Sequence, residues 1–252
     1  GSGLKRSGNT SVRSAKSVKS NSGPSLSSAA LEELESLVDM LGNSDWKVRD
    51  QGVIGMEQLA IREGLKMASA MNKLFDAFTP RLADSNSKVN LHALESFRRF
   101  LPAIKDAFGT NHAVVGQVVS KVSGNLASKS QGIRMTSADT FKDLVVHLDP
   151  TLLLQPFAAA AEYGTQKVKE GLIPHICKLV DPVCNSNVKL VKKYLIPLLT
   201  QMLGEKKDAR ECATLCGTLL DKMGRDALLG AASSLPPNKM KLLETQITHL
   251  TN

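Results

Sequence analysis

The chain has 252 residues, of which 42% are hydrophobic, 22% are charged and only 4% are aromatic, and its formal net charge is +8. This length and apolar content allow a sizeable core and exclude a chain that is disordered throughout. The sequence contains no run of about 18 apolar residues and no signal peptide. It therefore predicts neither a membrane span nor secretion by that route.

The first thirty residues differ in composition from the rest of the chain. Residues 1–30 are rich in Ser, Gly and Asn, and they predict a disordered basic tail or linker, because they cannot bury enough apolar surface to offset ordering. The tail can act as an electrostatic tether for an acidic surface or as a plain solvated linker. Its five positive charges leave +3 of the net +8 for residues 31–252. We predict that residues 31–252 form one domain. These charges are Lys5, Arg6, Arg13, Lys16 and Lys19.

Apolar residues with helical spacing predict helices along the whole of residues 31–250. Asp45 is placed to cap the second helix with its side chain. No stretch alternates apolar and polar residues long enough to predict a strand. The predicted helices, taken in pairs, are 31–41 and 45–62, 66–82 and 87–107, 113–126 and 132–147, 152–161 and 166–180, 188–203 and 209–223, and 227–233 and 239–250.

Five prolines agree with these predicted helix boundaries, but four do not. Pro80, Pro150, Pro182, Pro236 and Pro237 lie where a boundary or a first helical turn is predicted. Four others fall inside predicted helices, where a proline removes a backbone hydrogen bond and kinks or ends the helix. They are Pro102, Pro156, Pro174 and Pro197.

A polar turn followed by a basic helix start recurs six times. The repeat, of 31–44 residues, is too long for a coiled coil and suits a pair of antiparallel helices stacked in a solenoid. We therefore predict an all-α fold, a HEAT-repeat α-solenoid of six helical pairs with every polar turn on the same edge. Aligned on one apolar residue, the series is Val48, Val89, Ile133, Val168, Ala209 and Met240, with steps of 41, 44, 35, 41 and 31 residues.

Trp46 is the only tryptophan, and it lies two positions before the apolar Val48. Two helical positions correspond to a rotation of about 200°, so Trp46 is predicted to point away from the core. An exposed tryptophan among charges is typical of a binding anchor. The alternative is a tryptophan folded back over the first helical pair as a hydrophobic cap.

The residues around the other turns are mostly basic or polar, and on one edge they would form a positive stripe suited to a long acidic partner. Isolated solvated lysines are the alternative. The candidate binding residues, with Trp46, are Lys47, Arg49, Ser87, Lys88, Lys129, Arg134, Lys167, Lys169, Lys206, Lys207 and Arg210.

The residues of the first two turns, 45–49 and 84–90, resemble the tubulin-binding turns of TOG domains, which are six-repeat HEAT solenoids. Within that group the sequence is most similar to the crescerin type, the TOG-array regulators of axonemal microtubules, and above all to their last TOG domain. The segments that carry this likeness are 86–96, 125–130, 147–149, 152–157, 223–224 and 231–233.

The resemblance implies binding of αβ-tubulin and microtubules through the turn edge, in the cytoplasm and cytoskeleton and in the cilium and its axoneme. Trp46 would lie against β-tubulin, and the lysines of the fourth and fifth turns would lie toward α-tubulin. The chain would be a monomeric domain of a larger multi-TOG protein. Gly132 in the third turn and Gln166 at the fourth-turn position equivalent to Trp46 depart from the family pattern.

Three other functions are considered. An enzyme is disfavoured, because the sequence lacks the common catalytic motifs. A nucleic-acid-binding solenoid fits the basic charge but lacks aromatic residues for base stacking. A generic HEAT-repeat adaptor with another acidic partner would share the architecture, and the sequence leaves it open. The histidines, scattered over separate predicted helices, are His92, His112, His147, His175 and His249.

The four cysteines have neither the density of a disulfide scaffold nor a CxxC spacing. No histidine lies close enough in sequence to complete a local zinc pattern. We expect buried structural thiols at these positions and no metal or cofactor. The cysteines are Cys177, Cys184, Cys212 and Cys216.

Overall fold

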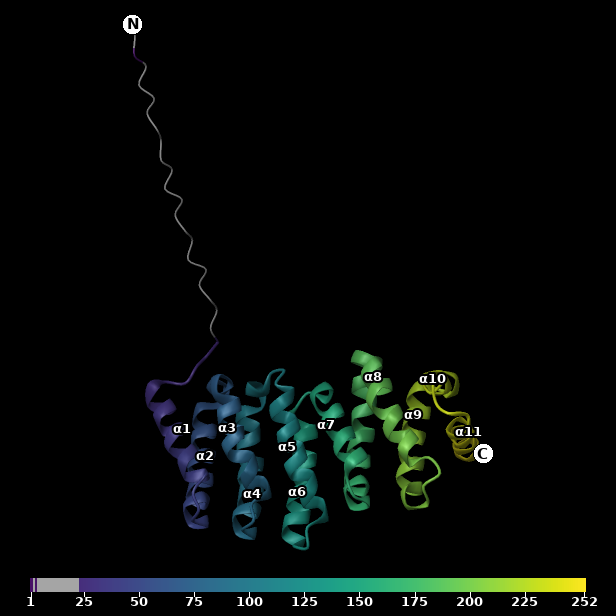
Figure 1. The fold of residues 1–252 in the computed structure, drawn as a ribbon, viewed down its shortest axis with the longest axis horizontal. Coiled ribbons are helices and arrows are strands. Elements are labelled where there is room, and N and C mark those ends of the chain that lie inside the picture. Colours follow the sequence, from purple (N-terminus) through teal and green to yellow (C-terminus); the bar gives the residue numbers. More distant parts are fainter. Residues whose placement is uncertain (2, 4–22) are drawn as a thin grey trace.

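The computed structural model describes residues 23–252 together with Gly1 and Gly3. Over this part of the chain it is built from α-helices and short 3-10 helices, with no strand. The helices stand side by side in a single extended row from the N-terminal to the C-terminal end (Figure 1). This arrangement is the predicted all-α solenoid of helical pairs.

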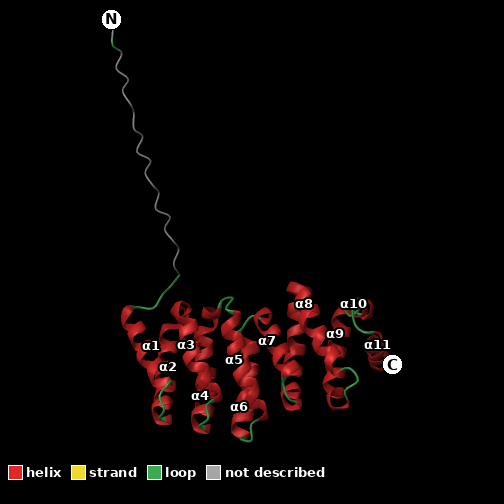
Figure 2. Ribbon diagram, viewed as in Figure 1, coloured by secondary structure: helices red, strands yellow, loops and turns green. Residues whose placement is uncertain are grey.

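Each pair has a first helix and a second helix that returns antiparallel to it (Figure 2). The first helices are α1 (Ser28–Leu41), α3 (Met71–Phe78), α5 (His112–Gly124), α7 (Pro150–Tyr163), the second half of α8 (Gln166–Met202) and α10 (Arg225–Ala231). The second helices are α2 (Trp46–Glu63), α4 (Ser87–Ile104), α6 (Gln131–His147), the first half of α8, α9 (Ala209–Met223) and α11 (Pro237–Thr251). The 3-10 helices are η1 (Gly64–Ala70), η2 (Thr79–Ala83), η3 (Lys105–Phe108), η4 (Asn125–Ala127) and η5 (Lys206–Asp208).

Side-chain caps fix where several second helices begin. The carboxylate of Asp45 accepts a hydrogen bond of 2.9 Å from the Lys47 N–H, as predicted. Asn86 caps α4 in the same way, and the hydroxyl of Ser130 caps α6. Each cap satisfies an amide of the first turn that has no partner within the helix.

Two predicted segments differ from the structure. Residues 66–82 do not form one helix but divide into η1, α3 and η2, with Pro80 in the first turn of η2. The predicted break between residues 180 and 188 is present but shorter, because α8 continues through Pro182 and leaves helical geometry only at Asn187, with φ −157° and ψ 83°. The fourth and fifth pairs therefore share one kinked helix.

The hydrophobic core runs along the row between the first and second helices. Aromatic packing is concentrated in the second pair, where Phe75 packs edge-on against Phe97 at 6.1 Å between ring centroids. Phe78 packs against Phe100 in the same way at 5.2 Å. Full burial of one such ring stabilises the fold by roughly 2–3 kcal/mol.

No helix among the residues that the structure describes is both long enough and apolar enough to cross a membrane.

The domain begins earlier than predicted. Leu26 is buried, and its N–H lies 3.4 Å from the Ser69 hydroxyl oxygen. Ser27 then caps α1, which starts at Ser28 and not at Leu31. Residues 26–30 therefore belong to the solenoid because Leu26 and Ala30 join its core. The five charges of the predicted tail lie outside the described residues, and the tail itself stays a prediction.

This start predicts different effects of two truncations. Removal of residues 1–22 should leave the melting temperature unchanged. Removal of residues 1–30 deletes Leu26 and the Ser27 cap, and we expect it to lower the free energy of unfolding by about 2–4 kcal/mol. Urea unfolding followed by circular dichroism measures both. Equal stability of the two truncated chains would contradict the assignment of residues 26–30 to the domain.

Candidate functional site

Five turns between first and second helices lie along the lower edge in Figures 1 and 2. We call this surface the turn edge, and its turns are residues 42–45, 84–86, 128–130, 164–165 and 203–208. The sixth turn does not reach it, contrary to prediction. Helix α10 has seven residues against fifteen in α9, so at 1.5 Å per residue it rises about 10 Å and ends short of the edge.

The fifth turn is also shifted in register from the prediction. Ala209, aligned with the core residue Val89, is the exposed first residue of α9, because Lys206–Asp208 forms a 3-10 turn before it. Val48 itself is only half-buried, whereas Val89, Ile133 and Val168 are buried. The predicted alignment thus holds for the second, third and fourth pairs.

The fourth residue of several second helices points inward. Arg49 holds this position in α2 and is only 9% exposed. Its Nε and Nη2 each donate to an Asp84 carboxylate oxygen at 2.9 Å, and its Nη1 donates to the carbonyls of Asn43 and Ser44 at 3.0 and 2.9 Å. The side chain thus closes its own turn and binds the next turn.

The same position repeats this role in later pairs. Asn90 exchanges hydrogen bonds with Asn125, which also donates to the Leu82 carbonyl at 2.6 Å. Lys169 is 6% exposed, and its Nζ lies 3.2 Å from an Asp208 carboxylate oxygen. Each contact joins a second helix to the following pair.

Arg134, like Arg49, donates hydrogen bonds to carbonyl groups of its own turn. Its Nη1 donates to the Ser128 and Lys129 carbonyls at 2.7 and 2.9 Å, six and five residues before it. Three residues of the predicted basic stripe are therefore used wholly or partly inside the protein. Arg49 and Lys169 are nearly buried, at 9% and 6% exposed, and the half-buried Arg134 supports the third turn.

Asp84 receives more than the Arg49 guanidinium. Its second oxygen lies 2.8 Å from Arg81 Nη1, and the Asn86 N–H donates to its first oxygen. Burial alone would raise the pKa of Asp84, but the hydrogen bonds from Arg49 and Asn86 and the charge of Arg81 outweigh it, and the pKa is lowered. The carboxylate is therefore charged and paired at neutral pH.

The remaining basic residues of the turn edge are exposed. Within the described part of the chain, none of them has a carboxylate oxygen within 4.0 Å, although cations elsewhere in the fold are often paired. Their charge faces solvent at or beside each of the five turns. They are Lys47, Lys88, Lys129, Lys167, Lys206, Lys207 and Arg210.

Trp46 takes a position between the two predicted alternatives. It packs against the rim of the core and is half-buried, so it is neither free of the body nor covered by it. The ammonium group of Lys88, from the next pair, lies 5.4 Å from its ring centroid, within the range of a cation–π contact. Ser87 is exposed beside Lys88. An aromatic surface and two turns of positive charge therefore meet at this end of the edge.

Sequence reasoning missed several residues of this region. Asp84, Asn125 and Asp208 receive the inward side chains from the preceding pair, and only their spacing of 35, 35 and 39 residues after Arg49, Asn90 and Lys169 could have indicated them. Met135, one turn into α6, is 59% exposed beside the third turn. Met135 offers an apolar contact at the third turn, where the residue equivalent to Trp46 is the polar Gln131.

The cysteines form no reactive or metal-binding cluster among residues 23–252. Cys212 and Cys216 are buried, while Cys177 and Cys184 are half-buried. Burial raises the pKa of Cys212 to about 12 and that of Cys216 to about 11. Both are protonated thiols at neutral pH and pack as small apolar groups.

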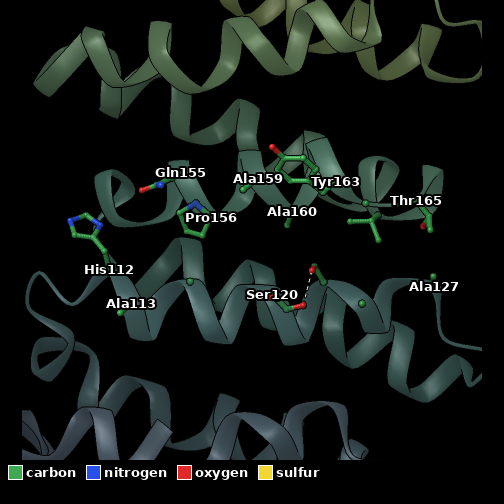
Figure 3. Close-up of a pocket in the computed structure, with 15 residues that line it drawn as sticks. His112, Ala113, Ser120, Ala127, Gln155, Pro156, Ala159, Ala160, Tyr163 and Thr165 are labelled. Atoms are coloured by element: carbon green, nitrogen blue, oxygen red, sulfur yellow. Dashed lines mark hydrogen bonds between the residues drawn. The ribbon is translucent and has the colours of Figure 1, made fainter. Parts of the chain in front are cut away.

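A groove lies between α5 and α7 and extends to the fourth turn, where Gly164 and Thr165 line it (Figure 3). It has a volume of about 720 Å³ and is lined mainly by small and apolar residues, with no Asp, Glu, Lys or Arg among them. His112 lies near one end, and Thr165 and Ala127 lie near the other (Figure 3).

These helical pairs, with inward polar ties and basic turns on one edge, define a HEAT-type solenoid with the fold of a TOG domain. Solved TOG domains share it: one from Zyg9 of Caenorhabditis elegans has a TM-score of 0.65 at 14% identity, covering 92% of this chain and 90% of that one. TOG3 of Drosophila melanogaster Mini spindles has a TM-score of 0.58 at 17% identity, covering 85% and 93%. A crescerin TOG structure has a TM-score of 0.57 at 17% identity, covering 85% and 88%.

Sequence similarity narrows the class. The chain is 28% identical over 245 residues to human TOG array regulator of axonemal microtubules protein 1, covering 92% of this chain and 14% of that protein. It is 24% identical over 223 residues to Crescerin-like protein che-12 of C. elegans, covering 85% and 17%. No family model matches the chain. The predicted resemblance to the crescerin type is confirmed, and the chain spans about one seventh of the length of the human relative.

The Arg49–Asp84 pair predicts a large and pH-dependent contribution to stability. Asp84→Ala leaves a buried guanidinium unpaired and should lower the free energy of unfolding by about 3–5 kcal/mol at pH 7. Because the pKa of Asp84 is lowered on folding, its contribution is complete above the ordinary value near 4 and is lost as the pH falls below it. The difference between the two proteins should therefore shrink between about pH 5 and pH 2.5.

Urea unfolding over this pH range measures the effect. Asp39→Ala removes an exposed carboxylate of α1 and is the matched control, expected to change stability by less than about 0.5 kcal/mol. A difference between wild type and Asp84→Ala that stays constant with pH would contradict the charged pairing.

Proposed function

We propose that this chain is a tubulin-binding domain that contacts αβ-tubulin through the turn edge. The single observation that carries the proposal is the row of exposed lysines, unpaired within the described chain, that starts beside the half-buried Trp46 and follows successive turns. Inward side chains with acidic or amide partners hold these turns together. The lysines therefore project from a fixed edge and gather positive charge on one side of the solenoid.

Known relatives supply the reason for choosing tubulin among acidic partners. The human and mouse relatives carry microtubule regulation in their names. The crescerin structure is described as part of a TOG domain array that regulates microtubules in the primary cilium. On this basis we assign the chain to the cytoskeleton and the cilium, as a binding domain and not an enzyme, within a larger protein with several such domains.

We further propose an orientation on the dimer. The first turn, with Trp46 and Lys47, faces β-tubulin, and the second turn extends this contact through Ser87 and Lys88. The fourth and fifth turns, with Lys167, Lys206 and Lys207, face α-tubulin. Lys129 and Arg210 add charge between and beyond them, while Met135 gives the third turn an apolar contact. Arg49, Lys169 and Arg134 act by holding the turns in place.

Trp46 is the first test. Trp46→Glu should weaken tubulin binding at least about tenfold, because it removes a large aromatic contact and puts a negative charge against an acidic surface. The half-buried position predicts a stability loss of about 1–2 kcal/mol, small enough to leave the domain folded. Sedimentation with purified tubulin and with stabilised microtubules measures binding, and thermal unfolding measures stability.

Val146→Glu makes the same kind of change, from an apolar to a negative side chain, at a residue that is 74% exposed near the end of α6 opposite the turn edge, and it should leave binding intact. Equal losses in the two variants, or unfolding of Trp46→Glu, would remove the support for Trp46 as an anchor.

The lysines form the second test. Lys167→Ala, Lys206→Ala and Lys207→Ala together should weaken tubulin binding about fivefold or more at low salt and reduce its salt dependence, since exposed charges act through screened attraction. The control triple is Lys105→Ala, Lys121→Ala and Lys241→Ala, which removes the same charge from exposed positions elsewhere.

Co-sedimentation over a range of salt concentrations separates the two sets. Unchanged affinity of the turn-edge triple at low salt would reject the basic stripe and favour an adaptor with a different acidic partner.

A further inference from the structure

A second cluster of unpaired cations lies in the part of α8 that follows the kink at Asn187. Lys189, Lys192 and Lys193 are all exposed, and residues 188–203 contain no Asp or Glu. Their spacing of three and four residues puts them on one face of the helix, where like charges repel one another. We call them the α8 lysine cluster.

The fold does not neutralise this cluster. Among the described residues, no carboxylate oxygen lies within 4.0 Å of any of the three ammonium groups, whereas cations on the second helices are paired across pairs, as Arg98 is with Asp143 at 2.6 Å and Arg99 with Glu57 at 2.8 Å. Lys193 makes a cation–π contact within the same helix, with its ammonium 5.2 Å from the ring centroid of Tyr194. The positive charge is left for a partner.

The cluster borders a groove between α8 and α10. This groove has a volume of about 490 Å³, and Lys192 lines it together with Ile196, Pro197 and Leu235. Ser234 lines it as well and is exposed. The groove can take an apolar side chain of a partner whose neighbouring acidic groups meet the lysines.

The cluster is separate from the turn edge. The three lysines precede the end of α8 at Met202 by nine to thirteen residues, which is about 14–20 Å along a helix, and the fifth turn lies beyond that end. Only the far end of the groove, at Thr200 and Gln201, comes close to that turn. A partner at the cluster therefore leaves Lys206 and Lys207 free for a partner of their own.

We infer that the α8 lysine cluster and the adjoining groove form a second binding surface for an acidic peptide segment that carries an apolar side chain. Three charges on about one turn of helix match a few carboxylates, and the groove gives an anchor that an acidic peptide can use. Nucleic acid fits less well, because the one aromatic residue here, Tyr194, is half-buried with Lys193 over its ring. The surface would allow the domain to hold a second acidic protein while its turn edge is occupied.

The test uses a fluorescein-labelled peptide of glutamates around one central leucine, with fluorescence anisotropy as the readout. Lys189→Gln, Lys192→Gln and Lys193→Gln together should weaken binding about tenfold at low salt. Two matched triples, Lys105→Gln, Lys121→Gln and Lys241→Gln, and the turn-edge set Lys167→Gln, Lys206→Gln and Lys207→Gln, should each change it less than about threefold. Equal losses in all three sets would mean that only net charge matters and would overturn the inference.

The groove is tested separately with Ser234→Trp, an exposed position where a large side chain fills the groove without entering the core. This variant should weaken binding of the leucine peptide about fivefold and leave a peptide of glutamates alone unaffected. Equal behaviour of the two peptides would overturn the groove assignment. Binding of the wild-type chain to a single-stranded oligonucleotide that depends on the α8 lysines, with no binding of either peptide, would replace the acidic peptide by nucleic acid.

Tubulin co-sedimentation of the same variants keeps this inference distinct from the proposed function. The α8 triple should retain tubulin binding, and the turn-edge triple should lose it. Loss of tubulin binding in the α8 triple alone would reject the turn edge as the tubulin site, whereas unchanged peptide binding in that triple would reject only the second surface.

Discussion

The buried pairing of Arg49 with Asp84 sets the geometry on which the turn edge depends. One guanidinium closes its own turn through two carbonyls and holds the following turn through a carboxylate. Burial of two charges is costly unless geometry and further hydrogen bonds are good, and here Arg81 and the Asn86 amide complete the carboxylate's partners. Asn90 with Asn125 and Lys169 with Asp208 repeat the connection further along. Adjacent turns are therefore held at fixed spacing by polar contacts, in addition to the hydrophobic core between the helices.

This arrangement divides the basic residues of the edge into two roles. The fourth residue of a second helix turns inward and finds an acidic or amide partner in the next pair, whereas the second residue, such as Lys47, Lys88 or Lys167, faces solvent with no such partner among the described residues. The inward residues make the edge rigid, and the outward ones give it charge. An edge of this kind loses little conformational entropy in its backbone on binding, and only the lysine side chains need to be ordered.

The sequence predicted the solenoid because helical periodicity and turn residues are local signals, and the bounds of α9 agree with the predicted 209–223. Long-range effects account for what it missed. Nothing near Arg49 in the sequence shows that Asp84 will bury it, so the sequence alone does not separate Arg49 from the exposed Lys47. Pro182 suggested a boundary, yet α8 passes through it, and the kink falls at Asn187. Trp46 was expected to face away from the core, but packing at its rim half-buries it. Local sequence signals therefore predict where helices form, whereas contacts with the neighbouring pair set how exposed each side chain is.

The shortness of α10 limits the footprint of the turn edge. Packed helices lie about 8–10 Å apart, so the five second helices whose starts reach the edge space its turns over roughly 40 Å. Beyond the fifth turn the seven-residue α10 withdraws the chain from this line. Among residues 23–252, a partner that continues past Arg210 meets no further turn on this edge, so one short helix, α10, sets the length of contact that these residues offer. Lengthening α10 by two helical turns would extend the footprint by one repeat without changing a single lysine.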